Sequence, residues 1–203
     1  MAKQEKLLFD YEEYFNEMLK DIAIMMFSTR HPGYQFVFYL NALYNIQLER
    51  LKNITLNNKS GDINATLYHH KDNVSHQTFM LLDIGHDMSG RLKNTIFDKT
   101  LLVFGADAIS MAGNIYDDLE TSATQGIDQE HELLRQSFID KGLIEYALFD
   151  FSDPDNPETT YFKNSRPSPD LLKKQQKFLK EQRTFICDLL LNLDDLLPDY
   201  EEE

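Results

Sequence analysis

The amino-acid sequence predicts an all-α protein, a helical bundle of about six helices with a proline-rich crossing before a long C-terminal helix. Apolar residues recur at steps of three and four over most of the chain, which is the spacing of one helical face. Stretches that alternate apolar and polar residues are short and isolated, so they are too few to form a sheet by themselves. Helical segments joined by short links are typical of a bundle.

The first predicted helix covers residues 7–26. Its apolar stripe continues over about five turns, and mainly acidic and amide side chains fall on the opposite side. Pro32 and Gly33 end it, because the residue before a proline disfavours helical backbone and glycine breaks helices. The stripe consists of Leu7, Leu8, Tyr11, Tyr14, Phe15, Met18, Leu19, Ile22, Met25 and Met26.

The second predicted helix runs from Tyr34 to Ile54, with apolar residues at the same spacing. Residues 57–62 have the composition of a turn. Ile63, Ala65 and Leu67 then alternate with polar neighbours, which indicates a short extended segment.

The third predicted helix is capped by Asp72 or Asn73 and ends near Met88. Three of its apolar residues, Phe79, Met80 and Ile84, fall outside the main apolar arc. This helix is therefore either buried on a second side or exposes an apolar contact surface. Because aromatic and methionine side chains are favoured at contact surfaces, we expect these three residues to form an interaction site. The main arc consists of Val74, Thr78, Leu81, Leu82, Gly85 and Met88.

A central helix is predicted from Phe97 to Leu119, where one apolar face continues throughout. Small residues in its middle allow neighbouring backbones to approach closely, which favours a central position in the bundle. An alternative interpretation is a strand from Thr100 to Phe104 that turns at Gly105 into a shorter helix. We favour one helix, because the candidate strand is only five residues long.

A further helix is predicted from Asp128 to Leu148, with acids in its first turn at Glu130 and Glu132 that suit the helix dipole. Gly142 lies inside this range and weakens the helical pattern, since glycine is a poor helix former.

Residues 1–151 are expected to form the bundle core. Residues 152–169 hold four of the six prolines and are expected to form a linker or surface crossing. The last helix, 170–198, packs on the same domain, and residues 199–203 form an acidic tail. The apolar seam of the last helix consists of Leu172, Gln175, Phe178, Leu179, Gln182, Phe185, Ile186, Leu189, Leu193 and Leu196, and its wet face carries Lys173, Lys174, Lys177, Lys180 and Arg183.

The chain of 203 residues has a formal net charge of −14, with 34 acidic and 20 basic residues. This surplus disfavours direct binding to nucleic acids or anionic membranes and favours basic partners. Cys187 is the single cysteine, which excludes an internal disulfide and suits a reducing compartment. No segment has the ~18 consecutive apolar residues of a membrane span. We therefore expect a cytoplasmic protein.

Histidine and aspartate side chains gather near the third predicted helix. On that helix His76, Asp83 and Asp87 lie on one side, His86 precedes Asp87 in the sequence, and His69 would extend the line if the helix began earlier. Imidazole and carboxylate groups are ligands that divalent metals accept. The line points away from the apolar arc, however, and a solvated polar face explains it. We keep His76, Asp83, His86 and Asp87 as metal-ligand candidates and assign no metal.

The residues Ile84-Gly85-His86-Asp87 resemble the His-Asp core of the HD-domain phosphohydrolases. That resemblance implies an all-α fold that holds a metal between helices. The family also needs a His well upstream and an Asp well downstream. In this chain His31 is rather distant, and Asp153 and Asp155 fall in the proline-rich segment.

The residues from Leu92 to Asp98 resemble a degenerate form of the Arg-Asn…His signature of the HEPN helical ribonucleases. Lys93 would replace the arginine and Asp98 the histidine. Because an ordinary aspartate titrates near 3.9, it does not suit acid–base chemistry at neutral pH. The resemblance therefore implies an inactive relative.

No residue pattern in the sequence assigns a catalytic group or a cofactor. We expect a non-enzymatic, acidic protein-interaction module that binds a basic protein partner or associates with itself. The alternatives are a metal-dependent HD-like phosphohydrolase and an inactive HEPN-like protein.

Overall fold

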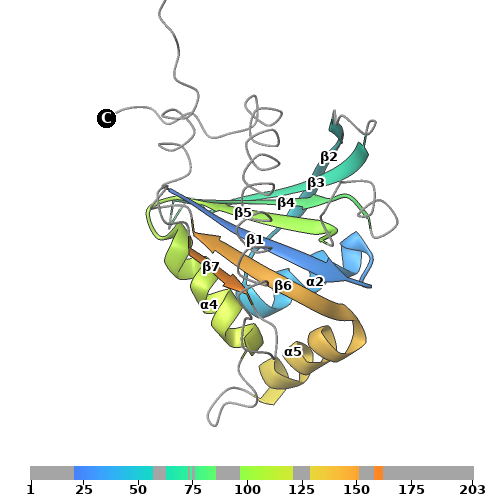
Figure 1. Ribbon diagram of the computed structural model, residues 1–203, viewed down its shortest axis with the longest axis vertical. Helices are drawn as coiled ribbons and strands as arrows, with labels where there is room; N and C mark the ends of the chain where they lie inside the picture. The colour runs from blue at the N-terminus through green and yellow to red at the C-terminus, as the bar shows by residue number, and fades with distance from the viewer. Residues whose placement is uncertain are drawn as a thin grey trace, which may run out of the picture.

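The structure is a computed structural model of the chain, and it describes residues 21–56, 63–72, 74, 76–85, 97–120, 129–150 and 158–161. These residues form an antiparallel sheet with helices packed on one of its faces, so the predicted all-α bundle is wrong (Figure 1). The first helix and the last two segments of the sequence prediction, residues 7–20, 170–198 and 199–203, lie outside the described residues.

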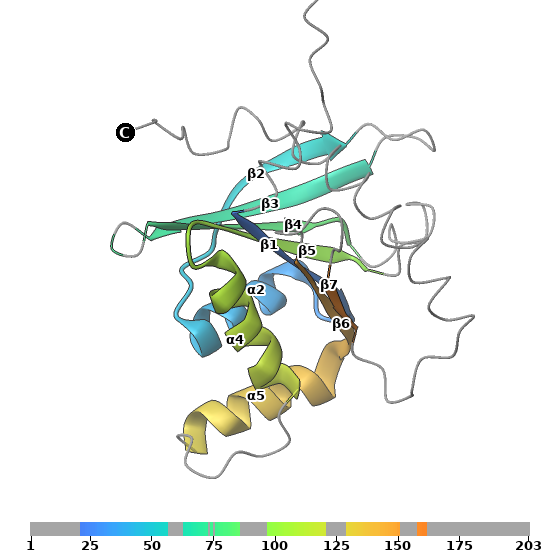
Figure 2. The ribbon, with the colours of Figure 1, turned by 60° about the vertical axis from the view of Figure 1, so that its left-hand side comes forward.

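Seven strands make up the described sheet, in the order β2-β3-β4-β5-β1-β6-β7, and every neighbouring pair is antiparallel. The strands are β1 (Ile22–Thr29), β2 (Glu49–Leu56), β3 (Ile63–Asp72), β4 (Gln77–Asp83), β5 (Lys99–Phe104), β6 (Leu143–Asp150) and β7 (Glu158–Tyr161). Two views show α2 (Gly33–Tyr44), α4 (Ala108–Glu120) and α5 (Gln129–Gly142) on the same side of this sheet (Figures 1 and 2).

β1 lies in the middle of the sheet, between β5 and β6, and all eight of its residues are buried. A strand that is covered on both faces is a continuous apolar run rather than an alternating one. A continuous apolar run has apolar residues at every position, so it fits the three- and four-residue spacing of a helix as well as the two-residue spacing of a strand. Ile22, Met25 and Met26 therefore fit the stripe of the first predicted helix although they belong to a strand, so that helix is wrong from residue 22 on.

The second predicted helix stops ten residues early, since α2 ends at Tyr44 and β2 follows. Asn45 takes the left-handed conformation, with φ 53°, that commonly ends a helix. The Asn41 side chain then fixes the exit, because it accepts a hydrogen bond from the Leu48 amide and donates one to the Leu48 carbonyl. The short extended segment predicted at residues 63–67 is confirmed as part of β3.

The third predicted helix is wrong, and its described middle is β4. The predicted central helix is also wrong in its first third. The chain forms β5 up to Phe104, turns at Gly105 with φ 123°, and begins α4 at Ala108, as the alternative interpretation has it. A positive φ of this size is easy only for glycine.

The helix predicted from Asp128 to Leu148 divides at Gly142 into α5 and β6. Glu130 and Glu132 do lie in the first turn of α5. Within the predicted proline-rich crossing, residues 158–161 form β7, which pairs with β6 at the sheet edge.

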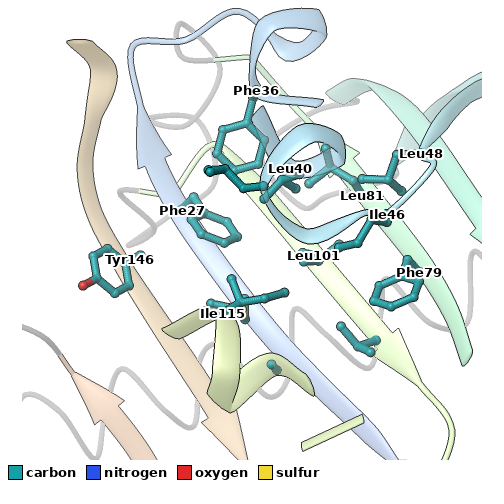
Figure 3. Packing of buried hydrophobic residues seen from close by; sticks show 14 of the residues in the cluster. Phe27, Phe36, Leu40, Ile46, Leu48, Phe79, Leu81, Leu101, Ile115 and Tyr146 are labelled. Atoms are coloured by element: carbon teal, nitrogen blue, oxygen red, sulfur yellow. The ribbon is translucent and has the colours of Figure 1, made fainter. Parts of the chain in front are cut away.

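The main core lies between the sheet and the three helices (Figure 3). Phe27 contacts Phe36 of α2 edge to face, with ring centroids 5.0 Å apart, and Phe36 packs in the same way against Phe138 of α5. Apolar residues that alternate along the strands supply the other half of this layer: Ala23, Met25, Phe79, Leu81, Leu101, Val103, Tyr146 and Leu148. None of the described helices is long and apolar enough to cross a membrane.

Candidate functional site

The outer stripe of α2 is the most unusual surface of the described residues. Tyr34 is 74% exposed and Phe38 is 58% exposed, and they lie one turn apart on the same side of the helix, followed by Ala42. The opposite side is buried through Phe36 and Leu40. α2 carries no charged residue at all, so even its solvent side is uncharged. We call Tyr34, Phe38 and Ala42 the aromatic stripe.

A polar network joins the C-terminal end of α2 to the ends of α4 and α5. The Tyr44 hydroxyl donates a hydrogen bond of 3.0 Å to Asp118 of α4, and burial and this carboxylate raise the pKa of Tyr44. His131 of α5 lies 3.6 Å from the same carboxylate. Arg135 donates to the Asp118 carbonyl oxygen and forms two hydrogen bonds with Glu132.

The helix layer is acidic around this network. α4 and α5 together carry six acidic residues against two basic ones, and one of the two bases is Arg135, which is buried and paired. The acids at this junction are Asp117, Asp118, Glu120, Glu130 and Glu132, and we call them the acidic junction. Along the helix axis, Tyr34 and Tyr44 are about 15 Å apart, so the acidic junction lies at the C-terminal end of the same helix that carries the aromatic stripe.

A second cluster of charges is buried at one end of β5. The Lys99 ammonium lies 2.6 Å from Asp98 and 3.2 Å from Asp83, and 5.7 Å from the centre of the Phe36 ring. The other oxygen of Asp98 accepts a hydrogen bond of 2.8 Å from the Thr29 amide. Lys99 and Asp98 are almost completely buried, so their charges balance each other inside the fold.

The metal-ligand candidates do not come together in the described residues. His76 is exposed in the turn between β3 and β4, whereas Asp83 is engaged by Lys99. His69 lies on β3, and burial lowers the pKa of this imidazole. His86 and Asp87 lie outside the described residues. Among the residues that the structure describes, no three His, Cys, Asp or Glu side chains are placed to hold a metal ion.

The predicted interaction residues Phe79, Met80 and Ile84 are 3%, 1% and 5% exposed. Their selection depended on a helix, and on β4 the same spacing places Phe79 and Met80 on opposite faces of the sheet. The premise of that selection is therefore wrong. That these three residues contact a partner stays a prediction, but the helical spacing on which it was based is absent.

The two family resemblances imply all-α folds, which the sheet contradicts. Asp98, which would replace the HEPN histidine, is a buried partner of Lys99, and Lys93 is outside the described residues. His31, considered as a distant metal ligand, is buried and its Nε2 donates to the Phe138 carbonyl oxygen at 2.8 Å.

Sequence reasoning missed the aromatic stripe and Lys99. The signal for the stripe is the sequence GYQFVFYLNALY, in which no charge marks a solvent side. The signal for Lys99 is the pair Asp98-Lys99, which lies between Phe97 and an apolar run. Charged residues are rarely buried unless they are paired, so adjacent opposite charges in an apolar stretch indicate a buried ion pair.

Neither a search against sequence models of known protein families nor a search of curated proteins finds a match to this chain.

Proposed function

We propose that this chain is a protein-interaction module rather than an enzyme, and that it binds a basic segment of another protein along α2. The aromatic stripe carries the proposal. A helix without charges that exposes two aromatic side chains is typical of a contact surface, where tyrosine and phenylalanine are favoured anchors.

Charge selects the kind of partner. The acidic junction lies at the C-terminal end of α2, so a partner segment that contacts Phe38 and extends along the helix by a few residues reaches these acids. Lysine and arginine complement that surface. A second copy of the chain is disfavoured, because each copy carries a net charge of −14 and like charges repel.

The exposed sheet edge is a weaker candidate for the binding surface. β2 pairs only with β3 and its other edge is open within the described sheet. Arg50 and Lys52 lie on this strand, on either side of an irregularity in its register. Charged side chains and irregular pairing are devices by which proteins discourage the addition of a further strand.

Peptide selection on the immobilised full chain tests the proposal. A random-peptide display library should yield peptides that combine lysine or arginine with at least one apolar residue. The best peptide is then synthesised and its Kd is measured by fluorescence anisotropy. We expect Tyr34→Ser/Phe38→Ser to weaken the Kd at least about tenfold, which is the loss of about 1.4 kcal/mol.

Leu51→Ser is the matched control, since Leu51 is an exposed apolar residue that lies on the edge strand β2 and not on α2. It should leave the Kd unchanged. Substitutions at such exposed positions change stability by only about 0.5 kcal/mol, so all three proteins should have similar melting temperatures. Neutral or acidic peptides, or equal binding by the double variant, would contradict the proposal.

A further inference from the structure

The face of the sheet opposite the helices carries a second apolar layer. Its residues alternate with those of the main core along β1, β3, β4, β5 and β6. We call it the second face; it consists of Ile22, Ile24, Met26, Leu67, Met80, Leu82, Leu102, Phe104, Ala147 and Phe149.

Strand register joins these residues into continuous rows. Ile24 of β1 lies opposite Leu102 of β5 on one side and Phe149 of β6 on the other, and Leu102 lies opposite Met80 of β4. Residues that lie directly opposite in neighbouring strands share a face. One row of large apolar side chains therefore crosses four strands.

The second face is buried although α2, α4 and α5 all lie on the other side of the sheet (Figure 2). Ile24 and Phe149 are fully buried and Met80 and Leu102 are 1% exposed. An antiparallel sheet that faced water on one side would carry polar residues there. A covering element of this chain therefore has to lie outside the described residues.

We propose that residues 170–198 form an amphipathic helix that docks on the second face. The seam of this segment has leucine, isoleucine and phenylalanine at helical spacing, and its lysines fall on the opposite side. A helix of this length extends about 43 Å, whereas seven strands span about 29 Å between the outermost two. It is long enough to cross the whole sheet.

The connection also fits. The last described strand, β7, ends at Tyr161 on the edge of the sheet next to β6. The residues between Tyr161 and Asp170 reach roughly 30 Å when extended, which is sufficient to pass from that edge to the second face. The rival segment, residues 7–20, would form a helix of only about 21 Å. We therefore assign the second face to residues 170–198.

Spin labelling of the single cysteine tests this in the unmodified chain. Cys187 lies within the proposed helix but off its seam. A nitroxide there should strongly broaden the methyl signals of Met26 and Met80 on the second face. Met111 of α4, in the helix layer, is the internal reference and should be broadened less. The chemically reduced nitroxide supplies the unbroadened signal of each methionine.

Two variants sharpen the test. Phe178→Glu/Leu189→Glu, on the seam, should remove the excess broadening of Met26 and Met80. Lys177→Glu, on the solvent-facing side of the proposed helix, should leave this excess broadening unchanged.

Three results would overturn the proposal. One is equal broadening of Met26, Met80 and Met111. Another is equally strong broadening of Met26 and Met80 in an isotope-labelled Cys187→Ser chain that is mixed with a spin-labelled chain of natural isotope content, which would identify a second copy. The third is broadening by a label at Glu13→Cys in a Cys187→Ser chain but not by one at Cys187, which would identify residues 7–20.

Discussion

Lys99 shows how much a single residue can depend on its neighbours. Its ammonium group is buried beside the carboxylates of Asp98 and Asp83 and close to the ring of Phe36. The cost of removing such charges from water is offset only while the partners remain together. The cluster joins three strands at one end of the sheet. Lys99 of β5 contacts Asp83 of β4, and Asp98 accepts a hydrogen bond from the amide of Thr29 of β1.

We expect Lys99→Met to lower the free energy of unfolding by about 3–5 kcal/mol, since it leaves the buried Asp98 without a cation. Asp98→Asn in the same chain removes the stranded charge and should restore part of the loss. Urea unfolding at pH 7 measures both. A loss below about 1 kcal/mol in the single variant would mean that water reaches Asp98.

The Glu132–Arg135 pair should make stability depend on acid pH. The hydrogen bonds from Arg135 lower the pKa of Glu132 below its ordinary value of 4.5. A lowered carboxyl pKa stabilises the fold above the unfolded-state value, and this contribution disappears as pH falls through the folded-state value. We therefore expect the pair to contribute at pH 7 and to contribute nothing well below pH 4.5.

A double-mutant cycle with Glu132→Gln and Arg135→Met isolates this contribution, when urea unfolding is measured at pH 7, 5, 4 and 3. The coupling between the two residues should be constant down to pH 5 and then decline. Coupling that persists unchanged at pH 3 would show that the pair does not act through the Glu132 charge.

At the scale of elements, the end of α5 depends on the absence of one side chain. A Cβ at Gly142 would lie 2.5 Å from ring atoms of His31, which is stacked on Phe138 and bound to its carbonyl oxygen. The Gly142 carbonyl also accepts hydrogen bonds from the Arg30 amide and the Thr29 hydroxyl. The junction of α5 and β6 is thereby held against the end of β1.

We expect Gly142→Ala to destabilise the protein by about 1–3 kcal/mol, because it overpacks the site of His31. Gly113→Ala, inside α4, should do the opposite and stabilise by about 0.5–1 kcal/mol. Its added Cβ would meet nothing within 4 Å, and alanine is the better helix former. Thermal unfolding of the two variants should shift in opposite directions, and a shift in the same direction would contradict the account.

The boundaries of several elements can be predicted from single residues, but their type cannot. Asn45, Gly105 and Gly142 are visible in the sequence, and each one lies at a boundary between a helix and another element. Periodicity failed for β1 and β4, because residues buried on both faces of a sheet are continuously apolar and also fit a helical stripe.

The candidate site was harder to predict for a different reason. The aromatic stripe is recognised only when the buried side of α2 is known, since Phe36 and Phe38 are the same residue type two positions apart. Likewise, Lys99 and Asp83 are brought together by the pairing of β4 with β5, in which they lie directly opposite each other. Neither relation follows from spacing along the chain.

For the whole molecule, the central position of β1 governs when the fold can form. The neighbours of β1 are β5 and β6, which begin at Lys99 and Leu143. A ribosome adds about 5–20 residues per second, so β1 waits on the order of ten seconds for β6 to be made. Until β5 is made, eight residues rich in isoleucine and methionine have no native partner strand. They are the segment of a nascent chain that a chaperone would be expected to hold.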